Sequence, residues 1–134
     1  MVVLDASVAL GFCLEDERAS LAASAIETLE DSALAVPAHW WAEICNGLLM
    51  VERRKRISSG DHSQCLALLA DLEPHIHAIS PNEFDAEVFT LAKKHRLTIY
   101  DACYLYLAIR EDYPLLTTDK TLQKAAKAER VALL

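Results

Sequence analysis

Short apolar segments alternate with longer segments of helical spacing along the whole of this 134-residue chain. Strands are expected at Val2–Leu4, Leu34–Val36, His75–Ile79, Leu115–Thr118 and, as a last edge strand, Val131–Leu134. Short strands separated by helices are typical of a parallel sheet that is covered on both faces. The chain is therefore expected to fold as α/β, in three α/β/α layers around a central, mostly parallel sheet.

The segments between the predicted strands have the apolar spacing of helices. Helices are expected at Ala19–Leu29, from Ala38 to about Arg54, from a cap at Asp61 to Glu73, from Ser80-Pro81 to about His95, at Asp101–Glu111 and at Lys120–Glu129. No internal repeat, low-complexity tract or linker interrupts this order. The length fits one domain over residues 1–134 with a core of its own.

Composition narrows the classes of function. A formal net charge of −7 disfavours indiscriminate binding to the nucleic-acid backbone, but not a nucleic-acid enzyme whose acids gather at a metal. The cysteines lack CxxC spacing and are interpreted as reduced core residues; they are Cys13, Cys45, Cys65 and Cys103. Since no basic segment precedes an apolar one at the N-terminus, and no uncharged run reaches the roughly 20 residues that span a bilayer, a cytoplasmic protein is expected.

Four acidic residues lie beside mostly apolar segments, where an isolated charge is costly unless it is paired, hydrogen-bonded or bound to metal. They are Asp5, Glu43, Asp101 and Asp119. Two of them follow predicted strands and two lie in the first turn of predicted helices. Because ligand sites in open α/β sheets lie beyond the carboxyl ends of the strands, the four side chains are expected to converge there. Asn46, one turn after Glu43 on the same helical face, would add a carbonyl or a hydrogen bond.

Clustered carboxylates suit a divalent cation. Two like charges about 4 Å apart repel each other by roughly 4 kcal/mol at an effective dielectric constant of 20. A cation bound between them makes the total electrostatic energy favourable. Carboxylate oxygens are the ligands that Mg²⁺ and Mn²⁺ prefer, and such an ion activates water and stabilises charge on a phosphate.

Each acid also has an ordinary structural interpretation. Asp5 would cap the turn into Ser7-Val8-Ala9 and Asp119 the last helix. Asp101 would be an ordinary acid at a helix N-terminus, and Glu43 would reach solvent or pair with an arginine. For each capping acid considered alone, the structural role is the favoured interpretation. Because all four acids lie in similar apolar surroundings, however, a shared metal site is favoured for the set.

Four motifs occur in a fixed order along the chain. They are Val3-Leu4-Asp5-Ala6-Ser7, Glu43-Ile44-Cys45-Asn46, Tyr100-Asp101-Ala102-Cys103-Tyr104-Leu105 with Leu107-Ala108, and Leu116-Thr117-Thr118-Asp119. In these motifs the chain resembles PIN-domain nucleases over its whole length, and in length and layout it is similar to the VapC-type toxins of bacterial toxin–antitoxin pairs. The resemblance implies a metal-binding catalytic quartet of Asp5, Glu43, Asp101 and Asp119, with Ser7, Asn46 and Thr117 in support.

The same resemblance implies an endoribonuclease that uses Mg²⁺ or Mn²⁺ and cuts particular tRNAs or ribosomal loops. It also implies a homodimer and a small antitoxin whose tail enters the acidic groove. Some relatives carry a further acid just after the fourth acid of the quartet. This chain has Lys120-Thr121-Leu122 there, so the resemblance does not determine whether the site binds one metal ion or two.

Other interpretations stay open beside the toxin. They are a PIN-fold module that binds RNA or protein without turnover, and a nuclease of RNA processing outside a toxin system. An aspartate-nucleophile phosphatase is disfavoured, because Ser7 stands where such enzymes place a second aspartate. The basic run Arg53-Arg54-Lys55-Arg56 is interpreted as a solvated helix end, ahead of a contact with RNA phosphates. Trp40-Trp41 and Tyr104 with Tyr106 are interpreted as core or dimer surface.

Overall fold

Four parallel strands form the central sheet of the computed structural model, which describes residues 1–55, 57 and 59–134. They are β1 (Val2–Leu4), β2 (Leu34–Pro37), β3 (His75–His77) and β4 (Leu115–Leu116), in the spatial order β3-β2-β1-β4. The register aligns Val3 with Ala35 of β2 and with Leu115 of β4. The parallel sheet confirms the predicted fold class.

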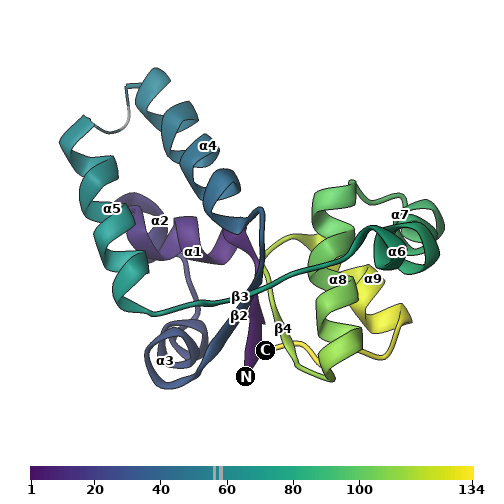
Figure 1. The fold of residues 1–134 in the computed structure, drawn as a ribbon. Helices are drawn as coiled ribbons and strands as arrows, with labels where there is room; N and C mark the ends of the chain where they lie inside the picture. Colours follow the sequence, from purple (N-terminus) through teal and green to yellow (C-terminus); the bar gives the residue numbers. More distant parts are fainter. Residues whose placement is uncertain (56, 58) are drawn as a thin grey trace.

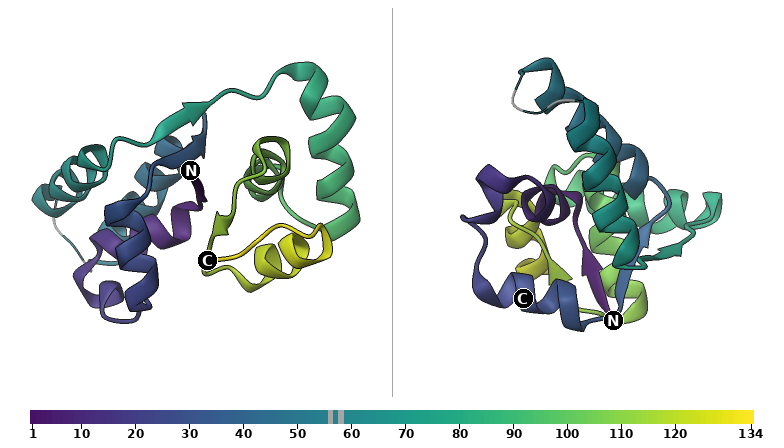
Figure 2. Two further views of the ribbon diagram at one scale, coloured as in Figure 1. Left: turned by 90° about the horizontal axis from the view of Figure 1, so that it is seen from below. Right: turned by 90° about the vertical axis from the view of Figure 1, so that its left-hand side faces the viewer.

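Helices lie on both sides of this sheet. They are α1 (Ala6–Cys13), α2 (Glu15–Arg18), α3 (Ala23–Asp31), α4 (Trp40–Arg53), α5 (Ser59–Asp71), α6 (Pro81–Glu83), the π-helical turn η1 (Phe84–Val88), α7 (Phe89–His95), α8 (Ile99–Glu111) and α9 (Lys120–Ala128). Figure 1 shows α1 to α5 on one side and α6 to α9 on the other, and the views in Figure 2 agree. The chain is therefore layered as α/β/α.

The predicted elements differ from the observed ones mainly before residue 24. Helices α1 and α2 were not expected, and α3 begins at Ala23 rather than Ala19. Most of α1 is buried, including Val8 and Phe12, so it lacks the alternation of polar and apolar faces by which an amphipathic helix is detected. The expectation that Asp61 caps a helix is wrong, because α5 begins at Ser59 and Asp61 lies within its first turn.

The C-terminal strands are shorter than expected. The strand predicted over Leu115–Thr118 ends at Leu116, and Thr117, the next residue, donates its hydroxyl to Asp5. The edge strand predicted over Val131–Leu134 is reduced to a single parallel bridge between Leu115 and Leu133. Strand pairing of β4 therefore stops just before Thr117, whose side chain contacts Asp5.

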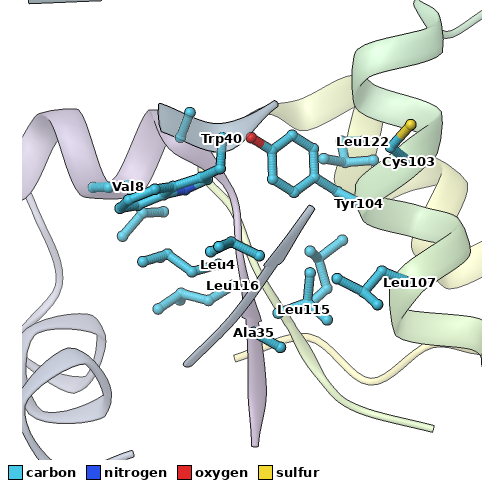
Figure 3. Packing of buried hydrophobic residues seen from close by; sticks show 14 of the residues in the cluster. Leu4, Val8, Ala35, Trp40, Cys103, Tyr104, Leu107, Leu115, Leu116 and Leu122 are labelled. Atoms are coloured by element: carbon cyan, nitrogen blue, oxygen red, sulfur yellow. The ribbon is translucent and has the colours of Figure 1, made fainter. Parts of the chain in front are cut away.

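The core lies between the sheet and the two helical layers. In Figure 3, Val8 and Trp40 lie on one side of the strands, and Tyr104 and Leu107 lie on the other. Helix α8 packs against β1, β2 and β4, and its residues from Ala102 to Ala108 are all buried. This burial of α8 leaves its first turn in a fixed position above the strand ends.

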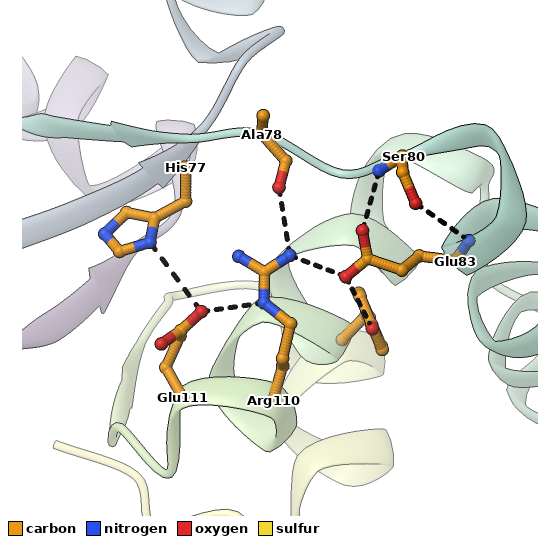
Figure 4. Close-up of polar contacts among 7 residues, drawn as sticks. His77, Ala78, Ser80, Glu83, Arg110 and Glu111 are labelled. Atoms are coloured by element: carbon orange, nitrogen blue, oxygen red, sulfur yellow. Dashed lines mark hydrogen bonds and ion pairs between the residues drawn. The ribbon is translucent and has the colours of Figure 1, made fainter.

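A polar network ties α8 to the segment that leads from β3 into α6 (Figure 4). Arg110 donates to Ala78 O at 2.9 Å and to Glu83 Oε1 at 2.8 Å. Ser80 and Glu83 form a capping box, in which each side chain bonds the backbone N–H of the other. The N–H of Ser80, then Arg110, lowers the pKa of Glu83 to about 2.

All four thiols are free, but they do not share one environment. Cys65 and Cys103 are buried and Cys13 is half-buried, whereas Cys45 is exposed on α4. The core interpretation is therefore wrong for Cys45, which lies on the solvent side of an amphipathic helix. Among the described residues, no helix combines the length and apolar character needed to cross a membrane.

Candidate metal centre

Asp5 is the first residue after β1, and only 4% of it is exposed. Its Oδ2 accepts hydrogen bonds from Ser7 Oγ and from Thr117 Oγ1, both at 2.6 Å. Thr117 directly follows β4, the neighbour of β1, so parallel pairing places the two side chains at the same edge. Burial raises the pKa of Asp5, although the two hydroxyls act in the opposite direction.

Glu43 reaches the same edge from the first turn of α4. Its Oε1 accepts a hydrogen bond from Tyr104 OH at 2.9 Å and lies 3.2 Å from His39 Nε2. The histidine contact lacks hydrogen-bond geometry, and Nε2 is buried with no hydrogen-bond partner among the described residues. Both neighbours lie at Oε1, which leaves Oε2 of Glu43 without a hydrogen bond from the described part of the chain.

Asp101 lies in the first turn of α8, and its backbone N–H donates to Thr98 Oγ1 at 3.1 Å. Burial, followed by the negative charges of Asp5, Asp119 and Glu43, raises the pKa of Asp101 to about 6. Within the described residues, no lysine or arginine lies within ion-pair distance of these four acids. The carboxylates therefore repel one another without compensation from a lysine or arginine in the described part of the chain.

Three of the four predicted acids converge closely. Asp5, Glu43 and Asp101 each offer a carboxylate oxygen, and these three atoms lie within 4.8 Å of one another. Oxygens that bind one Mg²⁺ at roughly 2.1 Å lie no more than about 4.2 Å apart. Small side-chain movements would bring this donor set to a hard divalent cation, so the residues fit such an ion.

Asp119 stands apart from the three converging acids. It is exposed, and its Oδ1 caps α9 by accepting the N–H of Leu122 at 2.7 Å. It nevertheless lines the same cavity of about 310 Å³ as the other acids. Asp119 therefore caps a helix, as its ordinary structural interpretation predicts, and also lines the acidic cavity.

The predicted supporting residues occupy different positions around this cavity. Ser7 and Thr117 hold Asp5 directly, and Thr118 Oγ1 donates in turn to Ser7 Oγ at 3.0 Å. Asn46 is exposed and lines the cavity one turn beyond Glu43. The hydroxyls therefore orient one carboxylate, whereas the Asn46 amide faces the open space.

Sequence reasoning missed the two side chains that contact Glu43. Tyr104 follows Asp101 by three residues and His39 precedes Glu43 by four, which are spacings that place helical neighbours on one face. That spacing was the available signal. Tyr104 was interpreted as core or dimer surface, and it is fully buried, but its hydroxyl also reaches the acidic site.

The described part of the basic run, Arg53 to Lys55, lies away from the cavity. Arg53 ends α4, and Arg54 and Lys55 follow it on the surface, whereas Arg56 lies outside the described residues. Arg53 follows Glu43 by ten residues, which is roughly 15 Å along an α-helix.

The fold and the site together define a class of protein: an α/β protein with a cluster of carboxylates beyond the carboxyl ends of its parallel strands. Residues 2–128 match the family model of the PIN domain. The chain belongs to the PIN domain family, which confirms the resemblance found in its motifs.

Individual relatives agree with this assignment. The chain is 30% identical to Ribonuclease VapC3 of Pyrobaculum aerophilum over 122 residues, which are 90% of this chain and 91% of that relative. Its fold is similar to the crystal structure of PAE2754 from Pyrobaculum aerophilum, with a TM-score of 0.72 and 24% identity, over 92% of this chain and 78% of the other. A toxin–antitoxin complex from Klebsiella pneumoniae contains a similar fold, with a TM-score of 0.56 and 19% identity, over 89% of this chain and 87% of the other.

Proposed function

We propose that this protein is a metal-dependent endoribonuclease. The observation that carries the proposal is the convergence of Asp5, Glu43 and Asp101 at the strand ends of a PIN fold. The likeness to Ribonuclease VapC3 supports RNA as the substrate. The reaction is hydrolysis, in which the oxygen of water joins phosphorus and one ribose oxygen leaves with a proton.

The roles of the residues follow from their contacts. Asp5, Glu43 and Asp101 would hold Mg²⁺ or Mn²⁺, with Asp119 as a fourth acid at the cavity wall. When bound, such an ion lowers the pKa of water and stabilises the charge that develops on phosphate. Ser7 and Thr117 keep Asp5 in place; Asn46, on the wall, orients what enters the cavity.

We also propose that the nuclease is the toxin of a toxin–antitoxin pair in the cytoplasm. A small antitoxin would close the acidic cavity, the active form would be a homodimer, and the substrate would be a tRNA or a ribosomal RNA. The name of the VapC3 relative supports this assignment. A short antitoxin-like reading frame directly upstream would separate a toxin from a nuclease of general RNA processing.

The test is cleavage of total cellular RNA by purified protein with Mg²⁺, with Mn²⁺ and with EDTA. Asp5→Ala is compared with Asp31→Ala, which removes an exposed acid at the end of α3. Discrete fragments that require metal, disappear with Asp5→Ala and persist with Asp31→Ala would support the proposal. If folded, metal-loaded wild type leaves RNA intact, the protein is a binding module instead.

A further inference from the structure

A second cavity, of about 350 Å³, opens beside the acidic one. The two cavities share Glu43, Asn46 and Asp101, so a molecule that occupies one meets the wall of the other. The remaining walls are formed by His39, Ala42, Thr98 and Tyr100. A volume of this size lies in the range of about 300–1,000 Å³ typical of ligand pockets.

Tyr100 is the most exposed aromatic side chain near the candidate metal centre. It is 60% exposed and lies in the first turn of α8, directly before Asp101 and ahead of the buried run that begins at Ala102. Its ring centroid lies 5.4 Å from that of His39, with an angle of 59° between the planes. An exposed ring at the wall of a cavity offers a face on which a planar group stacks.

The charges of the cavity define what fits it. Two carboxylates, Glu43 and Asp101, lie on its shared wall, and the lining includes no lysine or arginine. A phosphate would be repelled here, whereas a neutral heteroaromatic ring that carries N–H donors would be favoured. Asn46 adds an amide that both donates and accepts hydrogen bonds.

We propose that His39, Asn46 and Tyr100 form a subsite for an unpaired nucleobase next to the phosphate that is cut, with the base stacked on Tyr100. This inference rests on the proposed ribonuclease function and deepens it. A base enters such a subsite only when it is free of its Watson–Crick partner, so the subsite selects an unpaired nucleotide beside the cut.

The experiment is equilibrium binding of a fluorescent RNA, measured by anisotropy with Ca²⁺ in place of Mg²⁺ and with the RNA checked for integrity on a gel. The same sequence is offered single-stranded and as a duplex. The variants are Tyr100→Ala, Tyr100→Phe and, as a control, Phe89→Ala, which removes another exposed ring from α7, outside both cavities.

We expect tighter binding of the single strand than of the duplex. Loss of one base–aromatic stack weakens binding roughly 5- to 100-fold, so Tyr100→Ala should show this loss, whereas Tyr100→Phe and Phe89→Ala bind like wild type. An equal thermal shift with Mn²⁺ in Tyr100→Ala and wild type shows that the fold and the metal centre persist. Unchanged binding by Tyr100→Ala, or equal affinity for the duplex, overturns the subsite.

The subsite and the nuclease proposal fail separately. If wild type cuts no RNA but binds single strands through Tyr100, the nuclease proposal fails and the subsite stands. If wild type cuts RNA and Tyr100→Ala has an unchanged KM, the subsite fails and the nuclease proposal stands. When both hold, Tyr100→Ala raises KM far more than it lowers kcat.

Discussion

At the scale of single residues, the two carboxylate oxygens of Glu43 differ in their hydrogen bonds. Tyr104 OH donates to Oε1, and Oε2 has no such donor in the described part of the chain. Burial of Tyr104, followed by the charges of Glu43 and Asp5, raises the pKa of its phenol. The hydroxyl therefore keeps its proton and acts as a permanent donor to Oε1, which holds the Glu43 carboxylate in place at the wall of the acidic cavity.

Tyr104→Phe should weaken metal binding while the protein remains folded. Removal of a hydrogen bond that orients a metal ligand typically lowers affinity by about 10- to 100-fold. The measurement is the melting temperature over a titration with Mn²⁺. Tyr106→Phe is the matched control, because its hydroxyl donates to Glu83, at 2.9 Å, in the network of Figure 4. Equal affinities in the two variants would contradict the orienting role of Tyr104.

Asp101→Asn should stabilise the metal-free protein at high pH. The pKa of Asp101 is raised to about 6, so the folded state binds this proton more tightly than the unfolded state does. The cost of ionisation is small below about pH 4, grows between about pH 4 and 6, and is complete above the folded pKa of about 6. A rise of about two in the pKa of Asp101 corresponds to a loss of about 3 kcal/mol in the free energy of unfolding without solvent screening. Because the side chain is partly exposed, we expect roughly 1 kcal/mol.

Urea unfolding in EDTA at pH 8 and at pH 4 checks this prediction. The gain from Asp101→Asn should appear at pH 8 and vanish at pH 4, where the wild-type carboxyl is already neutral. Asp85→Asn, at an exposed position, is the control. A gain of equal size at both pH values would mean that relief of charge repulsion is not its source.

At the scale of elements, α8 connects the metal centre to the proposed base subsite. Its first turn carries Tyr100 and Asp101, its next turn carries Tyr104, and Thr98 caps its N-terminus by accepting the N–H of Asp101. The buried body of α8 fixes where its first turn lies, and the cap satisfies a backbone N–H of that turn. The polar network around Arg110 fixes the opposite end of the helix.

Thr98→Ala should reduce the free energy of unfolding by about 1 kcal/mol, the usual contribution of an N-cap. Thr98→Ser keeps the hydroxyl and should restore stability. Urea unfolding of the two variants measures the difference. If both lose stability equally, the methyl group of Thr98 rather than its hydroxyl supports the helix.

Glu83→Gln should destabilise the protein at pH 7 and have progressively less effect in acid. The pKa of Glu83 is lowered to about 2, mainly by the N–H of Ser80 and then by Arg110. A depressed pKa contributes stability that is fully present above the unfolded value of about 4.3 and is lost as the pH falls towards 2. Melting temperatures of wild type and Glu83→Gln between pH 7 and pH 2 should therefore converge, whereas a constant difference would contradict this linkage.

At the scale of the whole molecule, the candidate metal centre lies where the two helical layers meet the strand ends. Figure 1 shows α4 and α8 on opposite sides of the sheet, and each contributes one acid beside Asp5 of the central strand. A bound cation would therefore connect three separate parts of the fold. Removal of that cation would leave mutual repulsion at the point where these parts meet.

Divalent metal should raise the stability of the whole protein by mass action. At about 100 times the dissociation constant, the gain is about 2.7 kcal/mol. Calorimetry with Mn²⁺ and after addition of EDTA measures it, with Asp5→Asn as the variant in which the gain should largely disappear. An equal gain in Asp5→Asn and wild type would show that the metal binds elsewhere.

The sequence by itself determined the layered parallel fold, the family and the positions of the acids along the chain. The place of Asp5 was predictable, because it follows a short apolar strand and parallel strands end at one edge, whereas the role of Thr117 came from the resemblance to PIN-domain nucleases. Helix α1 was not predictable, because burial on most of its surface removes the periodic pattern that marks a helix.

The tertiary structure alone decided how the acids are distributed and what surrounds them. Glu43 and Tyr104 are 61 residues apart, and Asp5 and Thr117 are 112 apart, so their contacts depend on how distant elements pack. The packing of α8 leaves Tyr100 exposed and Tyr104 buried, although both tyrosines flank the same acid. Burial and hydrogen bonding across elements are properties of the assembled core, and no pattern within one segment contains them.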